Sequence, residues 1–286
     1  MIQPNGSTQL LALFGAELSM SPSPATHTAW AQQAGLNWLY LPLSCRDDSA
    51  FIDLCSALME CSNFQGGNIT NPFKRITLNL PGIQLDASAE QCGAANTLYR
   101  KGEGKQSVWC LANTDLVGCS ETLSRILSPD CGSLAADTEP LFVILGTGAM
   151  AGTCAQAIAD ICGHQHSTRT IQLSRAQLEG GNAGEPLHYT TQTQLVVINT
   201  LPSGTHPDAD RLACTALEGL NNTPAASKHL FEISYLETGA SKKASTFGWD
   251  VVRGDLLFEE QARASFKLWA RCSAPTPTTA LQLSRV

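Results

Sequence analysis

The sequence predicts an α/β protein, and two observations lead to that class. Short apolar runs alternate with segments of helical spacing along most of the 286 residues, which is the pattern of strand–helix units with parallel strands. One run, residues 141–145, is apolar throughout and leads into a glycine-rich turn and a helical segment. Such a run is typical of a strand that is buried on both faces of a sheet.

The individual elements follow from these patterns. The predicted strands cover residues 10–14, 38–43, 95–99, 108–112, 141–145, 170–173, 195–198 and 230–233. The predicted helices cover residues 24–34, 47–60, 115–127, the segment that follows Gly148 and ends near Cys162, and 254–269. In the last of these, apolar residues recur at the spacing of one helix face.

Composition limits the partners that the chain can have. Hydrophobic residues make up 43% and charged residues 15%, so a packed core is expected and general disorder is excluded. The net charge of −7 and the pI of about 5.3 argue against a surface for nucleic acid or anionic membranes.

The chain carries no sign of export, membrane insertion or metal binding. No apolar run reaches the roughly 18 to 20 residues that span a bilayer, and the first residues lack a signal-peptide pattern, so we expect a cytoplasmic location. The 11 cysteines form no C-x-x-C pair, which favours buried thiols over zinc ligands or disulfides. The pair His164 and His166 could bind a metal, but a surface turn after a helix is the better interpretation, and we expect no metal site.

The glycine-rich turn has the spacing of a dinucleotide-binding motif. Gly146-Thr147-Gly148-Ala149-Met150-Ala151 matches G-x-G-x-x-A between a strand and a helix. In this motif the first glycine permits the tight turn, the second lets the backbone approach a pyrophosphate, and the alanine lets the helix pack closely. The sequence therefore predicts a Rossmann-like cofactor domain, with an ordinary strand–helix turn as the alternative.

The residue that follows the next strand indicates which nucleotide is bound. That strand ends in Leu173-Ser174-Arg175. An acidic residue here would bind a ribose 2′-hydroxyl, whereas an arginine accommodates a 2′-phosphate. Arg175 therefore favours NADP over NAD, with an exposed surface arginine as the alternative.

Polar clusters stand where several predicted strands end, at the edge where open α/β sheets bind ligands. They are Ser21-Pro22-Ser23-Pro24, Asn68 to Lys74, Asn96-Thr97 and Asn113-Thr114-Asp115. Their hydroxyls and amides suit a small substrate with hydroxyl and carboxylate groups.

Lys74 and Asp115 are the candidates for moving the substrate's proton. Burial would favour a neutral lysine that acts as a base, and a neighbouring carboxylate would favour a charged lysine that acts as a donor. The sequence leaves both states open. Taken singly, Lys74 could be a solvated lysine and Asp115 a helix cap.

Together these motifs resemble the shikimate dehydrogenase family, in the same order and with similar spacing over most of the chain. Residues 21–28 are similar to its S-x-S-P-x-x-H-N pattern, residues 68–74 to N-x-T-x-P-x-K, residues 93–97 to G-A-x-N-T and residues 113–115 to N-T-D. The closing helix, from Gln261 to Trp269, resembles the family's Q-A…F…W helix.

The resemblance implies an activity and a set of site residues. The activity is the NADP-dependent interconversion of 3-dehydroshikimate and shikimate, in the pathway to chorismate and the aromatic amino acids. Lys74 and Asp115 would be the catalytic dyad. The implied substrate residues are Ser21, Ser23, Thr70, Asn96, Tyr235 and Gln261. The implied cofactor residues are Gly146, Gly148, Ala149, Met150, Ser174, Arg175, Ile233 and Gly254.

The resemblance also implies a two-domain architecture. Residues 1–114, completed by residues 254–286, would bind substrate, and residues 115–253 would form the Rossmann-like NADP domain, with the catalytic cleft between the two. The expected assembly is a monomer or a homodimer.

The cofactor half departs from the family pattern more than the substrate half does. The usual G-A-G-G-A turn is replaced by residues 146–150, where Ala149 and Met150 could narrow a pyrophosphate pocket. The N-R-T-x-x-R run is reduced to Ser174-Arg175-Ala176, so one phosphate-binding arginine is missing, which implies weaker NADP selectivity.

Two other functions stay open from the sequence. A paralogue acting on quinate or a related cyclohexane carboxylate would use the same serines. A non-catalytic ligand sensor on this fold would explain the altered cofactor half, although it would have no need for Lys74 and Asp115.

Overall fold

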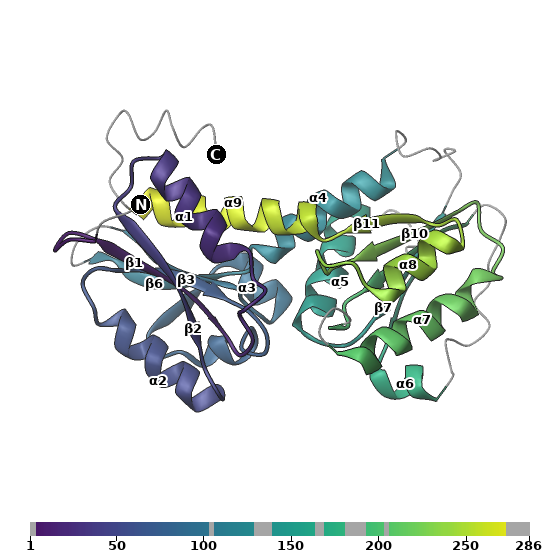
Figure 1. Ribbon diagram of the computed structural model, residues 1–286, viewed down its shortest axis with the longest axis horizontal. Helices are drawn as coiled ribbons and strands as arrows, with labels where there is room; N and C mark the ends of the chain where they lie inside the picture. The colour runs from purple at the N-terminus through teal and green to yellow at the C-terminus, as the bar shows by residue number, and fades with distance from the viewer. Residues whose placement is uncertain are drawn as a thin grey trace. The chain divides into compact units, whose positions relative to one another are not determined.

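The computed structural model describes residues 4–102, 106–128, 139–163, 169–180, 193–202 and 206–272. The chain divides into two compact units (Figure 1). One comprises residues 1–114 and 261–286, and the other comprises residues 115–260.

The first unit is built on a six-stranded sheet in the order β2-β1-β3-β5-β6-β4. Its elements are β1 (Gln9–Gly15), α1 (Ser23–Gln33), β2 (Trp38–Ser44), α2 (Asp48–Met59), β3 (Phe64–Ile69), the 3₁₀ helix η1 (Ile76–Asn79), β4 (Ile83–Leu85), α3 (Ala87–Cys92), β5 (Thr97–Lys101) and β6 (Val108–Ala112). The carboxyl-terminal part of α9 (Asp255–Cys272) also belongs to it.

Helices cover both faces of this sheet, because side chains of a strand alternate between its two faces. Leu11 and Leu13 of β1 pack with residues of α1 and α9, among them Phe266 and Trp269. Ala12 and Phe14 of the same strand pack on the opposite face with residues of α2 and α3. In Figure 1, α1 and α9 accordingly lie on the other side of the sheet from α2.

The second unit contains a five-stranded, fully parallel sheet in the order β11-β10-β9-β7-β8. Its elements are α4 (Asp115–Leu127), β7 (Glu139–Leu145), α5 (Ala149–Cys162), β8 (Arg169–Leu173), α6 (Arg175–Glu179), β9 (Thr193–Asn199), α7 (Pro207–Asn221), β10 (Ser227–Glu232), α8 (Gly239–Thr246), β11 (Asp250–Arg253) and the start of α9.

Strand β7, which lies between β9 and β8, again separates two helical layers. Leu141, Val143 and Leu145 face a cluster with α6, α7 and α8. Phe142 and Ile144 face a second cluster, to which α4, α5 and Leu257 contribute. Burial on both faces explains why this strand is apolar throughout.

The α/β class is confirmed in both units, and each predicted strand and helix is found to within a few residues. The first sheet, however, is mixed, because β5 runs antiparallel to both β3 and β6. The sequence analysis also misses β3, β4, β11, α3, α6, α7 and α8. No helix in the described ranges is long and apolar enough to cross a membrane.

Candidate active site

Two hydroxyl-bearing segments follow neighbouring strands of the first unit. Since β1 and β3 are parallel, the residues after Gly15 and after Ile69 lie at the same edge of the sheet. A Cβ on Gly15 would stand 2.5 Å from Cγ2 of Thr70, so glycine allows Thr70 to pack against the end of β1. In the segment after β1, the Ser23 N–H lies 3.4 Å from the Ser21 hydroxyl.

The start of α1 rests on a buried aromatic cluster. Ser23 is 7% exposed, and its hydroxyl is hydrogen-bonded to Tyr40. Burial raises the pKa of the Tyr40 phenol well above its usual range, and the contact with Ser23 opposes that shift. Burial also lowers the pKa of His27, which stacks on Tyr40 with ring centroids 4.7 Å apart, to about 3. Both rings are therefore neutral, and His27 packs in the core instead of carrying a proton.

Lys74 is positioned by the residues around it in the turn after β3. The neighbouring Phe73 is fully buried and stacks on Phe51 of α2, with ring centroids 4.8 Å apart. The Lys74 carbonyl accepts a hydrogen bond of 2.8 Å from the Ala95 N–H. The backbone of Lys74 is thus joined to the segment that carries Asn96, while its side chain is half-buried.

The Asn96 side chain has a defined orientation. Its Oδ1 accepts hydrogen bonds from the Thr114 N–H at 2.7 Å and from the Thr114 hydroxyl at 3.0 Å. Since these donors require an oxygen, the amide nitrogen Nδ2 must point the other way, and it lies 3.4 Å from Oε1 of Gln261. Asn96 and Gln261 therefore come together as a pair of oriented amides.

Three buried hydroxyls lie behind this amide pair. The hydroxyl oxygens of Thr97, Thr114 and Ser265 are 2.9 to 3.0 Å from one another. Ser265 also donates to the Gln261 carbonyl at 3.0 Å, one helical turn earlier in α9. We call these three side chains the hydroxyl triangle; it connects the start of β5, the segment just after β6 and α9.

Asn68 completes this network from β3. Its Oδ1 accepts a 2.9 Å hydrogen bond from the Tyr40 hydroxyl. Its Nδ2 lies 2.9 Å from the Ser265 hydroxyl and 3.2 Å from both the Thr97 hydroxyl and the Asn96 carbonyl. Asn68, Tyr40 and Ser265 are absent from the predicted site. The available signals were the first position of N-x-T-x-P-x-K for Asn68 and the four-residue spacing from Gln261 for Ser265.

In the second unit, the turn after β7 requires its first glycine. Gly146 has a φ of +112°, and a Cβ there would stand 2.7 Å from the Thr200 hydroxyl. The turn is held by hydrogen bonds from the Gly146 N–H to the Leu173 carbonyl and from the Gln172 side chain to the Gly146 carbonyl. Gly148 precedes the 14-residue helix α5, and no atom lies within 4 Å of the position that its Cβ would occupy. Open space above a helix N-terminus fits a pyrophosphate.

Ala149 and Met150 form the first turn of α5. Met150 packs against the apolar cluster between the sheet and the helices α4 and α5, which includes Ile144 and Cys154. Ala151 is fully buried, as its place in the motif requires for close packing of helix and strand.

Arg175 begins the short helix α6 immediately after β8. Ser174 caps this helix by a reciprocal pair of hydrogen bonds with Gln177. The Arg175 guanidinium is exposed, and its Nε lies 2.9 Å from Oε1 of Glu179. This contact raises the pKa of Arg175.

Three further predicted residues gather after β10. A Cβ on Gly254 would stand 2.1 Å from the Ile233 carbonyl oxygen, so glycine is needed for this approach. The ring of Tyr235 meets that of Phe258 edge-on, with centroids 6.0 Å apart, and burial raises the Tyr235 pKa. Ile233, Tyr235 and Gly254 thus form one group in the second unit.

Asp115 is the first residue of α4 and is 5% exposed. It belongs to the second unit, whereas Lys74 belongs to the first. Nearby in the same helix, a Cβ on Gly118 would stand 2.5 Å from the Leu257 carbonyl oxygen, so α4 packs closely on the start of α9.

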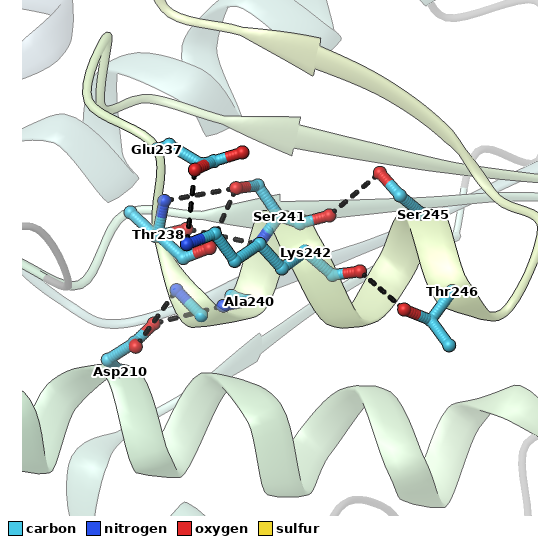
Figure 2. Close-up of polar contacts among 9 residues, drawn as sticks. Asp210, Glu237, Thr238, Ala240, Ser241, Lys242, Ser245 and Thr246 are labelled. Carbon is cyan, nitrogen blue, oxygen red and sulfur yellow. Dashed lines mark hydrogen bonds and ion pairs between the residues drawn. The ribbon is translucent and has the colours of Figure 1, made fainter.

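A buried carboxylate ends β10. Glu232 is fully buried and accepts hydrogen bonds from Asn199 at 2.8 Å and from the Thr238 hydroxyl at 2.9 Å. Thr238 in turn caps α8 by accepting from the Ser241 N–H at 3.0 Å, as Figure 2 shows. The same helix end is capped by Asp210 of α7, whose oxygens accept from the N–H groups of Gly239 and Ala240, each at 3.0 Å.

The buried Glu232 predicts a pH dependence of stability. Burial raises its pKa from 4.5 to about 6, so the folded state keeps a proton that the unfolded state releases between these values. The free energy of unfolding should therefore fall as pH rises from about 4.5 to about 6, by roughly 2 kcal/mol from this group. Urea unfolding of the wild type and of Glu232→Gln at pH 4.5 and pH 7.5 measures it. A stability difference between the two proteins that is equal at both pH values would contradict the prediction.

The described residues contain no group of three or more side chains that could hold a metal ion. His164 and His166 lie outside the described residues. Cys45, Cys55 and Cys110 are buried in the core clusters of the first unit, and burial raises the pKa of Cys55 to about 12.

Known proteins share both the sequence pattern and the fold. Residues 13–98 match the family model of the shikimate dehydrogenase substrate binding domain. The shikimate dehydrogenase (NADP(+)) of Methanosarcina barkeri is 29% identical over 281 residues, which cover 93% of this chain and 94% of the relative. The enzyme of the same name from Thermosynechococcus vestitus is 28% identical and covers 98% of this chain and 96% of its own length.

Solved structures agree with these relatives. Shikimate dehydrogenase from Aquifex aeolicus has a TM-score of 0.67 at 20% identity and covers 98% of this chain and 99% of its own. A shikimate dehydrogenase in complex with NADP+ has a TM-score of 0.59 at 18% identity, and the match covers 99% of this chain and 97% of that structure's chain. These likenesses concern the fold, while the family model and the relatives concern the sequence. The family model and the full-length relatives together support the assignment of this chain to the shikimate dehydrogenase family.

Proposed function

We propose that this chain catalyses the NADP-dependent, reversible reduction of 3-dehydroshikimate to shikimate. The observation that carries the proposal is the oriented amide pair of Asn96 and Gln261, built into a unit that matches the family's substrate-binding model. Amides that are held from behind by the hydroxyl triangle are preorganised to bind a polyhydroxylated ring.

The remaining substrate contacts come from side chains that the sequence analysis singles out. Ser21 and Ser23 lie in one turn and hold the substrate carboxylate, which requires the Ser23 hydroxyl to exchange its hydrogen bond with Tyr40 for one to the carboxylate. Thr70, at the adjacent strand end, and Tyr235 of the second unit contact the ring substituents.

Lys74 and Asp115 handle the proton of the reacting hydroxyl. When bound, NADPH supplies the hydride, so the protein's own task is to give the carbonyl oxygen a proton as it becomes a hydroxyl. Lys74 donates that proton in reduction and takes it back in oxidation, and Asp115 orients the ammonium group.

The residues of the second unit fit the cofactor. Gly146 and Gly148 leave room for the pyrophosphate at the start of α5, beside Ala149 and Met150. Ser174 and Arg175 would hold the 2′-phosphate of the adenosine ribose, and Ile233 and Gly254 would contact the nicotinamide.

The direct test is an assay of the purified full chain with shikimate and with quinate, each with NADP and with NAD. The proposal expects the fastest appearance of reduced nicotinamide with shikimate and NADP. A higher kcat/KM with quinate would identify the paralogue instead. Binding of shikimate without any reduction of either nucleotide would indicate a ligand sensor.

Removing the arginine at the 2′-phosphate should affect one nucleotide selectively. We expect Arg175→Ala to raise the KM for NADP at least tenfold and the KM for NAD less than twofold, because charge-assisted contacts to phosphate are strong. Steady-state kinetics with both nucleotides measures the two values. Arg125→Ala, which changes an exposed arginine of α4, is the control. An unchanged ratio of the two KM values would refute the assignment of Arg175.

A further inference from the structure

The position that decides between NADP and NAD in this chain holds two opposite charges. Arg175 and Glu179 stand one turn apart in α6, and the Arg175 Nε donates to Oε1 of Glu179 at 2.9 Å. Their side chains are 62% and 52% exposed, so both are accessible to a ligand.

We infer that Glu179 is a specificity-determining residue, whose carboxylate reduces the chain's preference for NADP over NAD. The inference rests on the proposed function, since it concerns the same cofactor site. It goes further because it assigns to Glu179 a role that opposes the preference of Arg175 for the 2′-phosphate.

The hydrogen-bond geometry gives the first reason. An arginine binds phosphate best when its planar fork presents parallel N–H groups to two oxygens. Glu179 occupies the Nε–H of Arg175, which blocks the one of the two fork edges that includes Nε. A 2′-phosphate must therefore displace Glu179 or bind through the terminal nitrogens alone.

Charge gives the second reason. A 2′-phosphate brings up to two negative charges close to the Glu179 carboxylate, which repels it, while Arg175 attracts it. A 2′-hydroxyl carries no charge and can donate a hydrogen bond to the same carboxylate, which is how acidic residues in Rossmann-like domains select NAD. The pair thus accepts both nucleotides.

The other charges near Arg175 do not reverse this balance. Asp208, at the start of α7, adds a further negative charge that acts on Arg175. Arg211 lies 3.9 Å from Asp208 and offsets it. Among the described residues around Arg175, Glu179 is the carboxylate in direct contact with it.

The test compares kcat/KM for NADP and for NAD in the wild type, Glu179→Gln and Glu179→Arg. Glu179→Gln keeps the shape and removes the charge, so the NADP-to-NAD ratio should rise about fivefold at low ionic strength. Glu179→Arg should raise it further. The gain should come from a lower KM for NADP, with the KM for shikimate unchanged, and it should shrink at high salt because exposed charges are screened.

A matched control is available in the same unit. Glu237 forms an exposed ion pair with Lys242, with side chains 59% and 65% exposed, at the start of α8 (Figure 2). Glu237→Gln removes one carboxylate from the surface without touching α6 and should leave the ratio within twofold of the wild type. If both Glu179 variants also stay within twofold, the inference is wrong.

Nucleotide binding separates this inference from the proposed function. If the wild type turns over neither shikimate nor quinate, the proposed reaction fails, but fluorescence titration with NADPH and NADH still measures the selectivity of the nucleotide site. Glu179→Gln should then tighten NADPH about fivefold and leave NADH unchanged or weaker. A variant that changes both affinities equally, or a wild type that binds neither nucleotide, overturns the inference.

Discussion

Lys74→Ala is expected to lower kcat for shikimate oxidation by about a thousandfold while changing the dissociation constant of shikimate by less than about tenfold. A positioned acid or base contributes typically 10² to 10⁴ in rate, because it acts mainly in the transition state. In the proposed site, the substrate's carboxylate and its other hydroxyls are bound by side chains other than Lys74, so binding should persist. Stopped-flow turnover together with calorimetric titration of shikimate measures the two effects.

The structure indicates that this variant will fold. The anchors of the turn are the Phe73 ring, which stacks on Phe51, and the backbone hydrogen bond between Ala95 and the Lys74 carbonyl, and alanine keeps both. Lys101→Ala, at an exposed lysine at the end of β5, is the matched control and should retain full activity. Equal losses in binding and turnover would show instead that Lys74 has a structural role.

The sequence predicts β7 and the turn after it well, because the packing of this strand permits few alternative residues. A strand buried on both faces must be apolar throughout, and the turn that follows it must admit a φ of +112° at Gly146. Both requirements are visible in the residues themselves.

The central strand β3 is not predicted from the sequence, because its residues have the composition of a turn. It contains Gln65-Gly66-Gly67-Asn68, which has low strand propensity. Yet a Cβ on Gly66 would stand 2.1 Å from the Leu98 carbonyl oxygen, and one on Gly67 would stand 2.2 Å from that of Ala12. The neighbouring strands approach so closely that only glycine fits. The same glycines give the segment the composition of a turn, so the sequence does not reveal it as a strand.

The candidate site divides in the same way. Motif spacing predicts Lys74, Asn96 and Gln261, since each stands in a recognisable local pattern. The Asn68–Ser265 contact joins residues 197 positions apart, and no local pattern encodes it. The Arg175–Glu179 pair is an intermediate case. Its four-residue spacing is visible in the sequence, but it predicts a contact only if these residues form a helix, and the sequence analysis does not predict α6.

The second large effect is expected for Asn68→Asp, a change of one amide nitrogen to oxygen. The Oδ1 that accepts from Tyr40 is kept, but the donor that faces the Asn96 carbonyl becomes an acceptor. Two oxygens would then meet at about 3.2 Å in a buried position, with a negative charge on one of them. Leaving such a group without suitable donors costs about 3 kcal/mol or more of the free energy of unfolding.

The same substitution should weaken substrate binding through the hydroxyl triangle. A carboxylate at position 68 would accept the Ser265 and Thr97 protons, so Ser265 could no longer donate to the Gln261 carbonyl. Thr97 would turn away from Asn96, whose amide would lose part of its fixed orientation.

We therefore expect the KM for shikimate of Asn68→Asp to rise at least tenfold while the KM for NADP, whose proposed site is in the other unit, changes less than twofold. Kinetics at a temperature well below the unfolding transition, together with urea unfolding, separates this effect from loss of folded protein. Asn79→Asp, at an exposed position of η1, makes the same chemical change without a buried partner and should alter neither quantity. If Asn68→Asp lost stability but kept its KM for shikimate, the network would support the fold and have no part in orienting Asn96.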